Sequence, residues 1–178
     1  MTTELDAIDA KILDLIQRDA ALSVAEIAEK VGLSSSPCWR RIKRMEEQGI
    51  IARRVTLLNY DKLGLNFEVV ANVKLSLPSR ENLEKFEQAV RKWPECIECM
   101  TVTGAVDYVM RIVTTDMHAY DNFLRDKILA LGLVSDIQSR IIVNVSKRTT
   151  AAPLGLISPY VPTQDRRIST SPRQASGR

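Results

Sequence analysis

Hydrophobic residues in the first 50 positions recur with the period of an α-helix. Over residues 5–18 the apolar positions fall at helical spacing with Asp and Lys between them, which predicts an amphipathic helix. Ser23 followed by Glu26 is the pattern of a capping box, so a second helix is expected over about residues 24–31, ended by Gly32. Each of these helices has one apolar stripe to bury.

A third helix is expected from Pro37 to Gln48. Ser36 offers a side-chain cap, Pro37 suits a first helical position, and Gly49 follows the last turn. Two helices joined by a short turn that contains Gly32 form the helix-turn-helix arrangement, whose second helix enters the major groove of DNA. The stripe of the third helix that faces the core consists of Cys38, Ile42 and Met45.

Positive charge gathers on this third helix and just behind it. The whole chain carries only +3, which identifies no partner. Residues 38–55, however, hold six Arg and Lys residues against two Glu, a local charge of +4. Charge alone favours a solvated helix face, whereas the helix-turn-helix spacing favours DNA. Trp39 fits a ring packed on the first helix as well as it fits a DNA contact. The predicted contacts to base edges are Ser34, Ser35, Ser36, Trp39 and Arg40, and the predicted contacts to phosphates are Arg41, Lys43, Arg44, Arg53 and Arg54.

From residue 67 the apolar period changes from helical to two, the spacing of a half-buried strand. Strand, helix, strand, strand, helix and strand follow in that order, which gives a ferredoxin-like βαββαβ sandwich and an α+β protein. One face of its sheet stays uncovered, with Val70, Val109 and Val113 on it, so two sheets are expected to pair in a homo-oligomer. The expected elements are a strand over 67–77, a helix ended by Pro94, strands over 96–103 and 106–114 joined by a tight turn at Gly104 and Ala105, a helix from Asp116 to Gly132, and a strand over 134–145.

Residues that bear redox or metal chemistry are few. Cys96 and Cys99 form a C-x-x-C pair, but they lie within an expected strand, where positions three apart point to opposite faces, so structural cysteines are favoured over a redox or metal pair. Cys38 is expected to be a small buried residue, and the single histidine, His118, a solvated one. We therefore expect no metal, no cofactor and no enzymatic activity.

Four segments of the first domain resemble the Lrp/AsnC family of bacterial and archaeal transcription factors: LDAIDAKILDLIQRD, LSVAEIAEKVGLS, SPCWRRIKRMEEQGII and RRVTLLN. In the second half, ECMTVTGAVDYVMRI resembles the family's effector-binding module, and TTAAPL resembles its usual ending. The resemblance implies a winged helix-turn-helix domain over 1–56, a linker strand within 57–66 and a ferredoxin-like domain over 67–154. Composition predicts that 155–178 form a disordered basic tail.

The resemblance also places a small-molecule cleft near the ECMTVTGAVDYVMRI segment. Backbone N–H groups around Gly104 suit an α-carboxylate and Asp107 suits an α-ammonium, so the implied effector is an amino acid. In the alternative interpretation Gly104 is only a hairpin turn and Asp107 only a solvated turn residue. The residues implied to bind the effector are Thr103, Gly104, Asp107, Tyr108, Ser139 and Arg140.

The expected function is that of a sequence-specific regulator of transcription that binds double-stranded DNA and responds to an amino acid. It is expected to act as a homodimer, with tetramers or octamers as larger assemblies, in the cytoplasm on the nucleoid. No apolar run approaches the ~20 residues of a membrane span, and the N-terminus is acidic where a signal peptide is basic. Two alternatives stay open: a chromosome-organising protein without an effector, and a decarboxylase built on the same framework.

Overall fold

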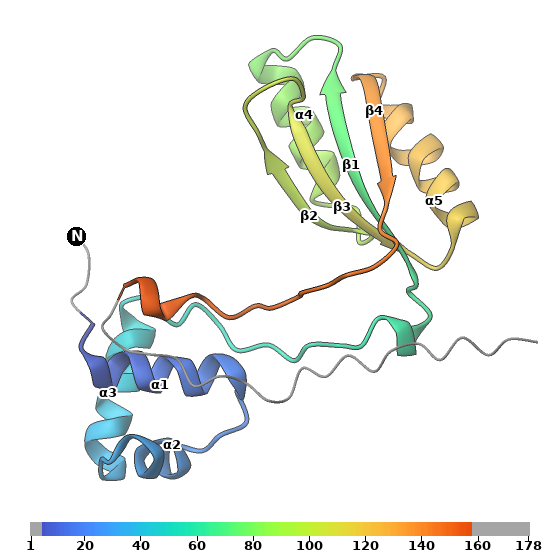
Figure 1. Cartoon of the computed structure of the whole chain (residues 1–178). Coiled ribbons are helices and arrows are strands. Elements are labelled where there is room, and N and C mark those ends of the chain that lie inside the picture. Colours follow the sequence, from blue (N-terminus) through green and yellow to red (C-terminus); the bar gives the residue numbers. More distant parts are fainter. Residues whose placement is uncertain (1–4, 158–178) are drawn as a thin grey trace, which may run out of the picture. The chain divides into compact units, whose positions relative to one another are not determined.

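The computed structural model describes residues 5–157, which form two compact units (Figure 1). Of the described residues, one unit contains 5–56 together with 148–157, and the other is Leu57–Lys147. The second unit is therefore an insertion in the first, with one covalent connection at each of its ends. No helix within residues 5–157 has the length and apolar character needed to span a membrane.

Three helices build the first unit: α1 (Ala7–Arg18), α2 (Val24–Val31) and α3 (Ser35–Glu47). The expected capping box of Ser23 and Glu26 is present, and Gly32 ends α2 with a left-handed φ of 73° that suits glycine. The third helix begins two residues earlier than predicted, because Ser34, not Ser36, is its N-cap. Pro37 is then the third helical residue, where its missing N–H removes no hydrogen bond.

Residues 148–157, here called the C-terminal strap, complete the first unit. Leu154 is 5% exposed and belongs to the same apolar cluster as Ile12, Ile27 and Ile42 of the three helices. Gln17 fixes the strap to α1, since its amide accepts from the N–H of Ala152 at 2.8 Å and donates to the Ala152 carbonyl at 3.3 Å.

The second domain was predicted to run to Leu154, whereas the compact unit that contains the sheet is Leu57–Lys147 and ends before the strap. Residues 155–157, predicted to be disordered, include the end of a short 3₁₀ helix, Leu154–Leu156. The rest of the predicted tail, 158–178, lies outside the described residues.

The second unit has the element order and layers of the expected ferredoxin-like sandwich. Its elements are β1 (Phe67–Leu75), α4 (Arg80–Val90), β2 (Cys96–Thr101), β3 (Tyr108–Thr114), α5 (Met117–Phe123, continued by helical turns to Leu131) and β4 (Val134–Ile141). The antiparallel sheet has the order β2-β3-β1-β4. One face of the sheet packs against both helices in a single core (Figure 1). That core includes Val69, Ala71 and Val73 of the sheet and Phe86, Tyr120 and Phe123 of the helices.

The connections differ from the predictions more than the elements do. Six residues, 102–107, join β2 to β3 in place of a tight turn, and β4 ends at Ile141 rather than near 145. The linker strand is absent from the described chain between α3 and β1, which holds only a 3₁₀ turn at Asp61–Leu63. Val55, Leu57 and Leu58 have strand-forming character but stay exposed, because no neighbouring strand pairs with them.

Candidate nucleic-acid interface and effector site

The first turns of α3 present the residues predicted to read DNA bases. Ser34, Ser35 and Ser36 are exposed, and Trp39 is 52% exposed rather than packed on α1. The opposite stripe of the helix is buried in the core of the unit, as expected for Cys38, Ile42 and Met45. The Ser34 side chain makes no cap hydrogen bond, so the first turn leaves polar groups available to an anion such as a phosphate.

The cations on α3 and just behind it divide into two sets, which the sequence did not distinguish. Arg40 and Arg53 are exposed and form no ion pair with any residue in 5–157. Lys43 and Arg54 lie 3.7 and 3.3 Å from the carboxylate of Glu46, in exposed pairs that contribute little and leave both side chains accessible to phosphates.

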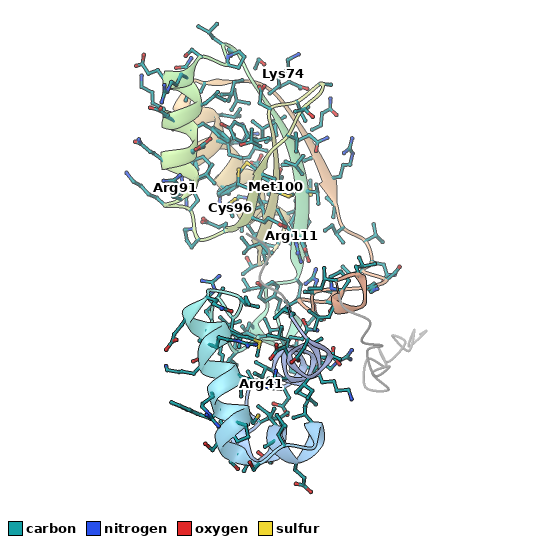
Figure 2. The ribbon with its side chains drawn as sticks, turned by 90° about the vertical axis from the view of Figure 1, so that its left-hand side faces the viewer. Arg41, Lys74, Arg91, Cys96, Met100 and Arg111 are labelled. Atoms are coloured by element: carbon teal, nitrogen blue, oxygen red, sulfur yellow. The ribbon has the colours of Figure 1, made fainter. Side chains whose placement is uncertain are left out.

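Arg41 and Arg44, both predicted to contact phosphates, are held by carboxylates of the first helix. Arg41 Nη1 lies 2.7 Å from Asp6 Oδ2 and 2.8 Å from Asp9 Oδ1, and Arg44 Nη2 lies 2.6 Å from Asp9 Oδ2. Figure 2 shows Arg41 between α3 and α1. The hydrogen bonds to Asp6 and then to Asp9 raise the pKa of Arg41. In the protomer both arginines therefore form ion pairs with α1, although 45% of the Arg44 side chain stays exposed, and their contact with phosphates stays a prediction.

Asp6 and Asp9 were not singled out as functional from the sequence, where they read as acidic residues suited to the start of a helix. They do form a capping box, and the N–H of Asp9 is the main cause of the lowered pKa of Asp6. No local pattern shows that α3 crosses this turn. One sequence signal could have predicted the pairing: α1 begins with two acidic residues three positions apart, and many of the cations of this unit lie on α3.

The loop that joins β2 to β3, residues 102–107, carries the core of the implied effector site. Thr103 and Gly104 are exposed, and Gly104 has a φ of +123° that favours glycine. Asp107 is half-buried: its Oδ2 accepts from the N–H of Leu75 at 2.7 Å, and its own N–H donates to the Val73 carbonyl at 3.0 Å. Asp107 thus shapes the loop and is not a merely solvated turn residue.

Three other residues of the implied effector set do not gather at this loop in the protomer. Tyr108 is 1% exposed in the core, where its hydroxyl donates to Glu87 at 3.3 Å and burial raises its pKa to about 12. Ser139 bonds the Tyr120 hydroxyl on the helix-covered face, whereas Arg140 pairs with Val70 on the other side of the sheet. Since Asp107 lies at Val73 and Leu75, Arg140 is roughly 10 to 17 Å away along β1.

A register shift between Cys96 and Glu98 corrects the predicted geometry of the C-x-x-C pair. This irregularity adds a residue to β2, so both thiols turn to the same face and pack against the core. Burial is the main cause that raises the pKa of Cys96 to about 11 and that of Cys99 to about 12. Within residues 5–157 no cluster of His, Cys, Asp and Glu is arranged to hold a metal, and His118 is exposed as expected.

We expect Cys96 and Cys99 in the folded protein to react with iodoacetamide at pH 8 at least about tenfold more slowly than in the urea-unfolded chain. The folded state keeps both protons at pH values where unfolded thiols, with an ordinary pKa of 9.0, lose them. Because the folded state binds these protons more tightly than the unfolded state, the free energy of unfolding falls as the pH rises from about 9 towards 11. Below about pH 9 both states keep the protons, and the two thiols then cause no such loss of stability. Mass spectrometry of the alkylated cysteines measures the rates. Equal rates would show that the fold does not protect the two thiols, and a faster rate in the folded protein would restore the redox interpretation.

Comparisons with known proteins cover most of the chain. Residues 5–52 match the family model of winged helix-turn-helix DNA-binding domains, and residues 68–152 match that of the Lrp/AsnC ligand binding domain. Transcriptional regulator AzlB of Bacillus subtilis (strain 168) is 36% identical over 150 residues, 84% of this chain and 96% of that protein. The proline dehydrogenase transcriptional activator of Rhizobium radiobacter is 38% identical over 148 residues, 83% of this chain and 95% of its own. A transcriptional regulator from Neisseria meningitidis, solved in complex with L-methionine, superposes with a TM-score of 0.83 at 36% identity, over 86% of this chain and 99% of that one.

Proposed function

The protein belongs to the Lrp/AsnC family of transcriptional regulators, and we propose that it reads double-stranded DNA with α3 and changes its DNA binding when an amino acid occupies the 102–107 loop. One observation carries the DNA-binding part. The helix that fits the major groove buries its apolar stripe and exposes Trp39, Arg40 and a polar first turn.

The exposed positions on α3 and just behind it support the following proposed DNA contacts. Side chains of the first turn, with Trp39 and Arg40, are proposed to meet base edges, because they lie at the exposed N-terminal end of α3. Lys43, Arg53 and Arg54 are proposed to neutralise phosphates, because all three are exposed.

The second unit is proposed to pair two protomers through the sheet face that its helices leave uncovered. Val70 and Val109 lie on that face beside Met100, which is 42% exposed. Val113, the third valine predicted there, is already 5% exposed within the protomer and adds little. A dimer presents two copies of α3 to two half-sites, and it therefore binds DNA with a higher affinity than a single domain does. Tetramers or octamers are proposed as assemblies of such dimers, acting on the nucleoid in the cytoplasm.

An amino acid is the proposed effector. The match to a ligand binding domain and the L-methionine held by the Neisseria relative support this class of molecule. In this chain the exposed backbone around Gly104 offers N–H groups for a carboxylate, and Asp107 holds the loop in that shape. We include Thr103 and Gly104 as direct contacts and Asp107 as the residue that fixes the loop.

The experiment selects a duplex from a random-sequence pool with the protein and titrates it with and without each of the twenty amino acids. At least one amino acid is expected to change affinity by about 5-fold to 150-fold, the range of coupling free energies of about 1–3 kcal/mol. Gly104→Ala should lose this response and keep DNA binding, because its φ disfavours a side chain. Unchanged affinity, cooperativity and assembly with all twenty would support the effector-independent chromosome-organising alternative instead.

A further inference from the structure

A buried carboxylate of the first helix bonds two cations of the third. Asp9, the third residue of α1, is 1% exposed. Its Oδ1 accepts from Arg41 at 2.8 Å and its Oδ2 accepts from Arg44 at 2.6 Å. Asp6, half-exposed at the helix cap, adds a second bond to Arg41 at 2.7 Å. These four residues are called the Asp9 cluster.

The Asp9 cluster restrains rotation of α3 about its own axis, a movement that the apolar core restrains less. The core stripe of α3 consists of Cys38, Ile42 and Met45, and apolar contacts have no preferred direction. Charge-assisted hydrogen bonds are directional and short. Because Arg41 and Arg44 are three residues apart, they hold α3 to α1 at two points within one turn. Rotation of α3 about its own axis by about 20° would move side-chain tips by roughly 2 Å or more, enough to break a hydrogen bond to a base.

We propose that Asp9 is a positioning residue for DNA recognition, which sets the rotation of α3 so that Trp39 and Arg40 face the bases. Arg41 and Arg44 act through Asp9 and not through phosphates. The inference rests on the proposed DNA-binding function. In this proposal a buried side chain that does not touch DNA contributes to sequence discrimination, through the two arginines that it holds.

The competing interpretation, in which Arg41 and Arg44 contact phosphates, predicts an opposite sign for one substitution. Asp9→Asn removes a negative charge and releases both arginines. If these arginines are phosphate contacts, the variant should bind every duplex more tightly, since electrostatic attraction does not depend on sequence. If Asp9 positions α3, the variant should lose affinity for the selected duplex and not for a scrambled one.

The test compares a duplex selected by the wild-type protein with a scrambled duplex of the same length, over a series of salt concentrations. In Asp9→Asn the ratio of the two affinities is expected to fall about tenfold or more, because two charged hydrogen bonds lose their acceptor charge. The slope of log affinity against log salt is expected to stay unchanged. Arg40→Ala, by contrast, should lower discrimination at one base position, because Arg40 is proposed to meet a base edge; a reduced salt slope with unchanged discrimination would place Arg40 on a phosphate instead.

Glu29→Gln is the matched control, because Glu29 is an exposed acid of α2 and its loss changes the net charge by the same amount. It should leave the affinity ratio unchanged. A partly unfolded Asp9→Asn would lower both affinities together, which thermal unfolding detects. Asp6→Asn then serves instead, since asparagine still caps α1 while its lost charge weakens the hold on Arg41. A folded Asp9→Asn, or Asp6→Asn in its place, whose ratio stays constant or rises overturns the inference. A wild-type protein that does not distinguish the two duplexes overturns the proposed function, and this inference with it.

Discussion

Replacement of Val109 by aspartate is expected to leave a folded monomer that binds the selected DNA about a hundredfold more weakly than the wild type. Val109 lies on β3 opposite Asn72 of β1 and Met100 of β2, near the middle of the uncovered sheet face. Val109 is only half-buried in the protomer, so the new carboxylate keeps access to water and folding is affected less than pairing. In a paired sheet it would be buried without a partner, and that costs several kcal/mol.

Sedimentation equilibrium gives the assembly state, and titration of the labelled duplex gives the affinity. Gln88→Glu is the control, because Gln88 is exposed on α4 and the same negative charge there should leave both quantities unchanged. A Val109→Asp protein that stays dimeric would show that protomers do not pair through this sheet face. A monomer with full DNA affinity would instead separate DNA binding from pairing.

Most of the fold follows from periodic patterns that act over short distances. The capping box at Ser23 and the alternation along β1 specify elements whose causes lie within a few residues, and the structure places both as expected. The order of the elements then leaves few topologies, which is why the ferredoxin-like sheet was predictable. The prediction of a linker strand was wrong because a strand needs a pairing partner, and its own sequence does not specify that partner.

For the candidate DNA-binding site, the sequence predicted which face of α3 is exposed but not which of its cations form ion pairs. A helical projection places Arg40, Arg41 and Arg44 alike outside the apolar stripe, so the sequence gives no reason to separate them. The separation comes from Asp9, which lies 32 residues from Arg41 and meets it only when α1 and α3 cross. At the C-x-x-C pair the error has another cause: the register irregularity near Cys96 cancels the simple alternation of faces.

The C-terminal strap returns to α1 after the whole second unit, a separation of 135 residues between Gln17 and Ala152, and no local pattern predicts such a contact. The strap contains two leucines that lie in different environments. Leu154 is 5% exposed in the core of the first unit, whereas Leu156, two positions on, is 82% exposed. This pair offers a direct measure of what the strap contributes to the stability of the DNA-binding unit.

Leu154→Ala is expected to lower the free energy of unfolding of the first unit by about 2–4 kcal/mol, the cost of removing a buried leucine side chain and leaving a cavity. Leu156→Ala is expected to change it by less than about 0.5 kcal/mol. Because the chain has two units, hydrogen exchange of the α1 amides should be followed rather than a single melting curve.

A shortened chain separates the strap from the residues beyond it. Ending the chain after Ile157 should leave α1 exchange unchanged, and ending it after Lys147 should accelerate exchange at least as much as Leu154→Ala does. The chain that ends at Lys147 also loses the second of the two covalent connections between the units, because the strap no longer anchors the residues after β4 to α1. Its DNA affinity should therefore fall, and any effect of an amino acid on that affinity should weaken. Equal exchange in all these chains would mean that the three helices fold to full stability alone and that the strap only rests on them.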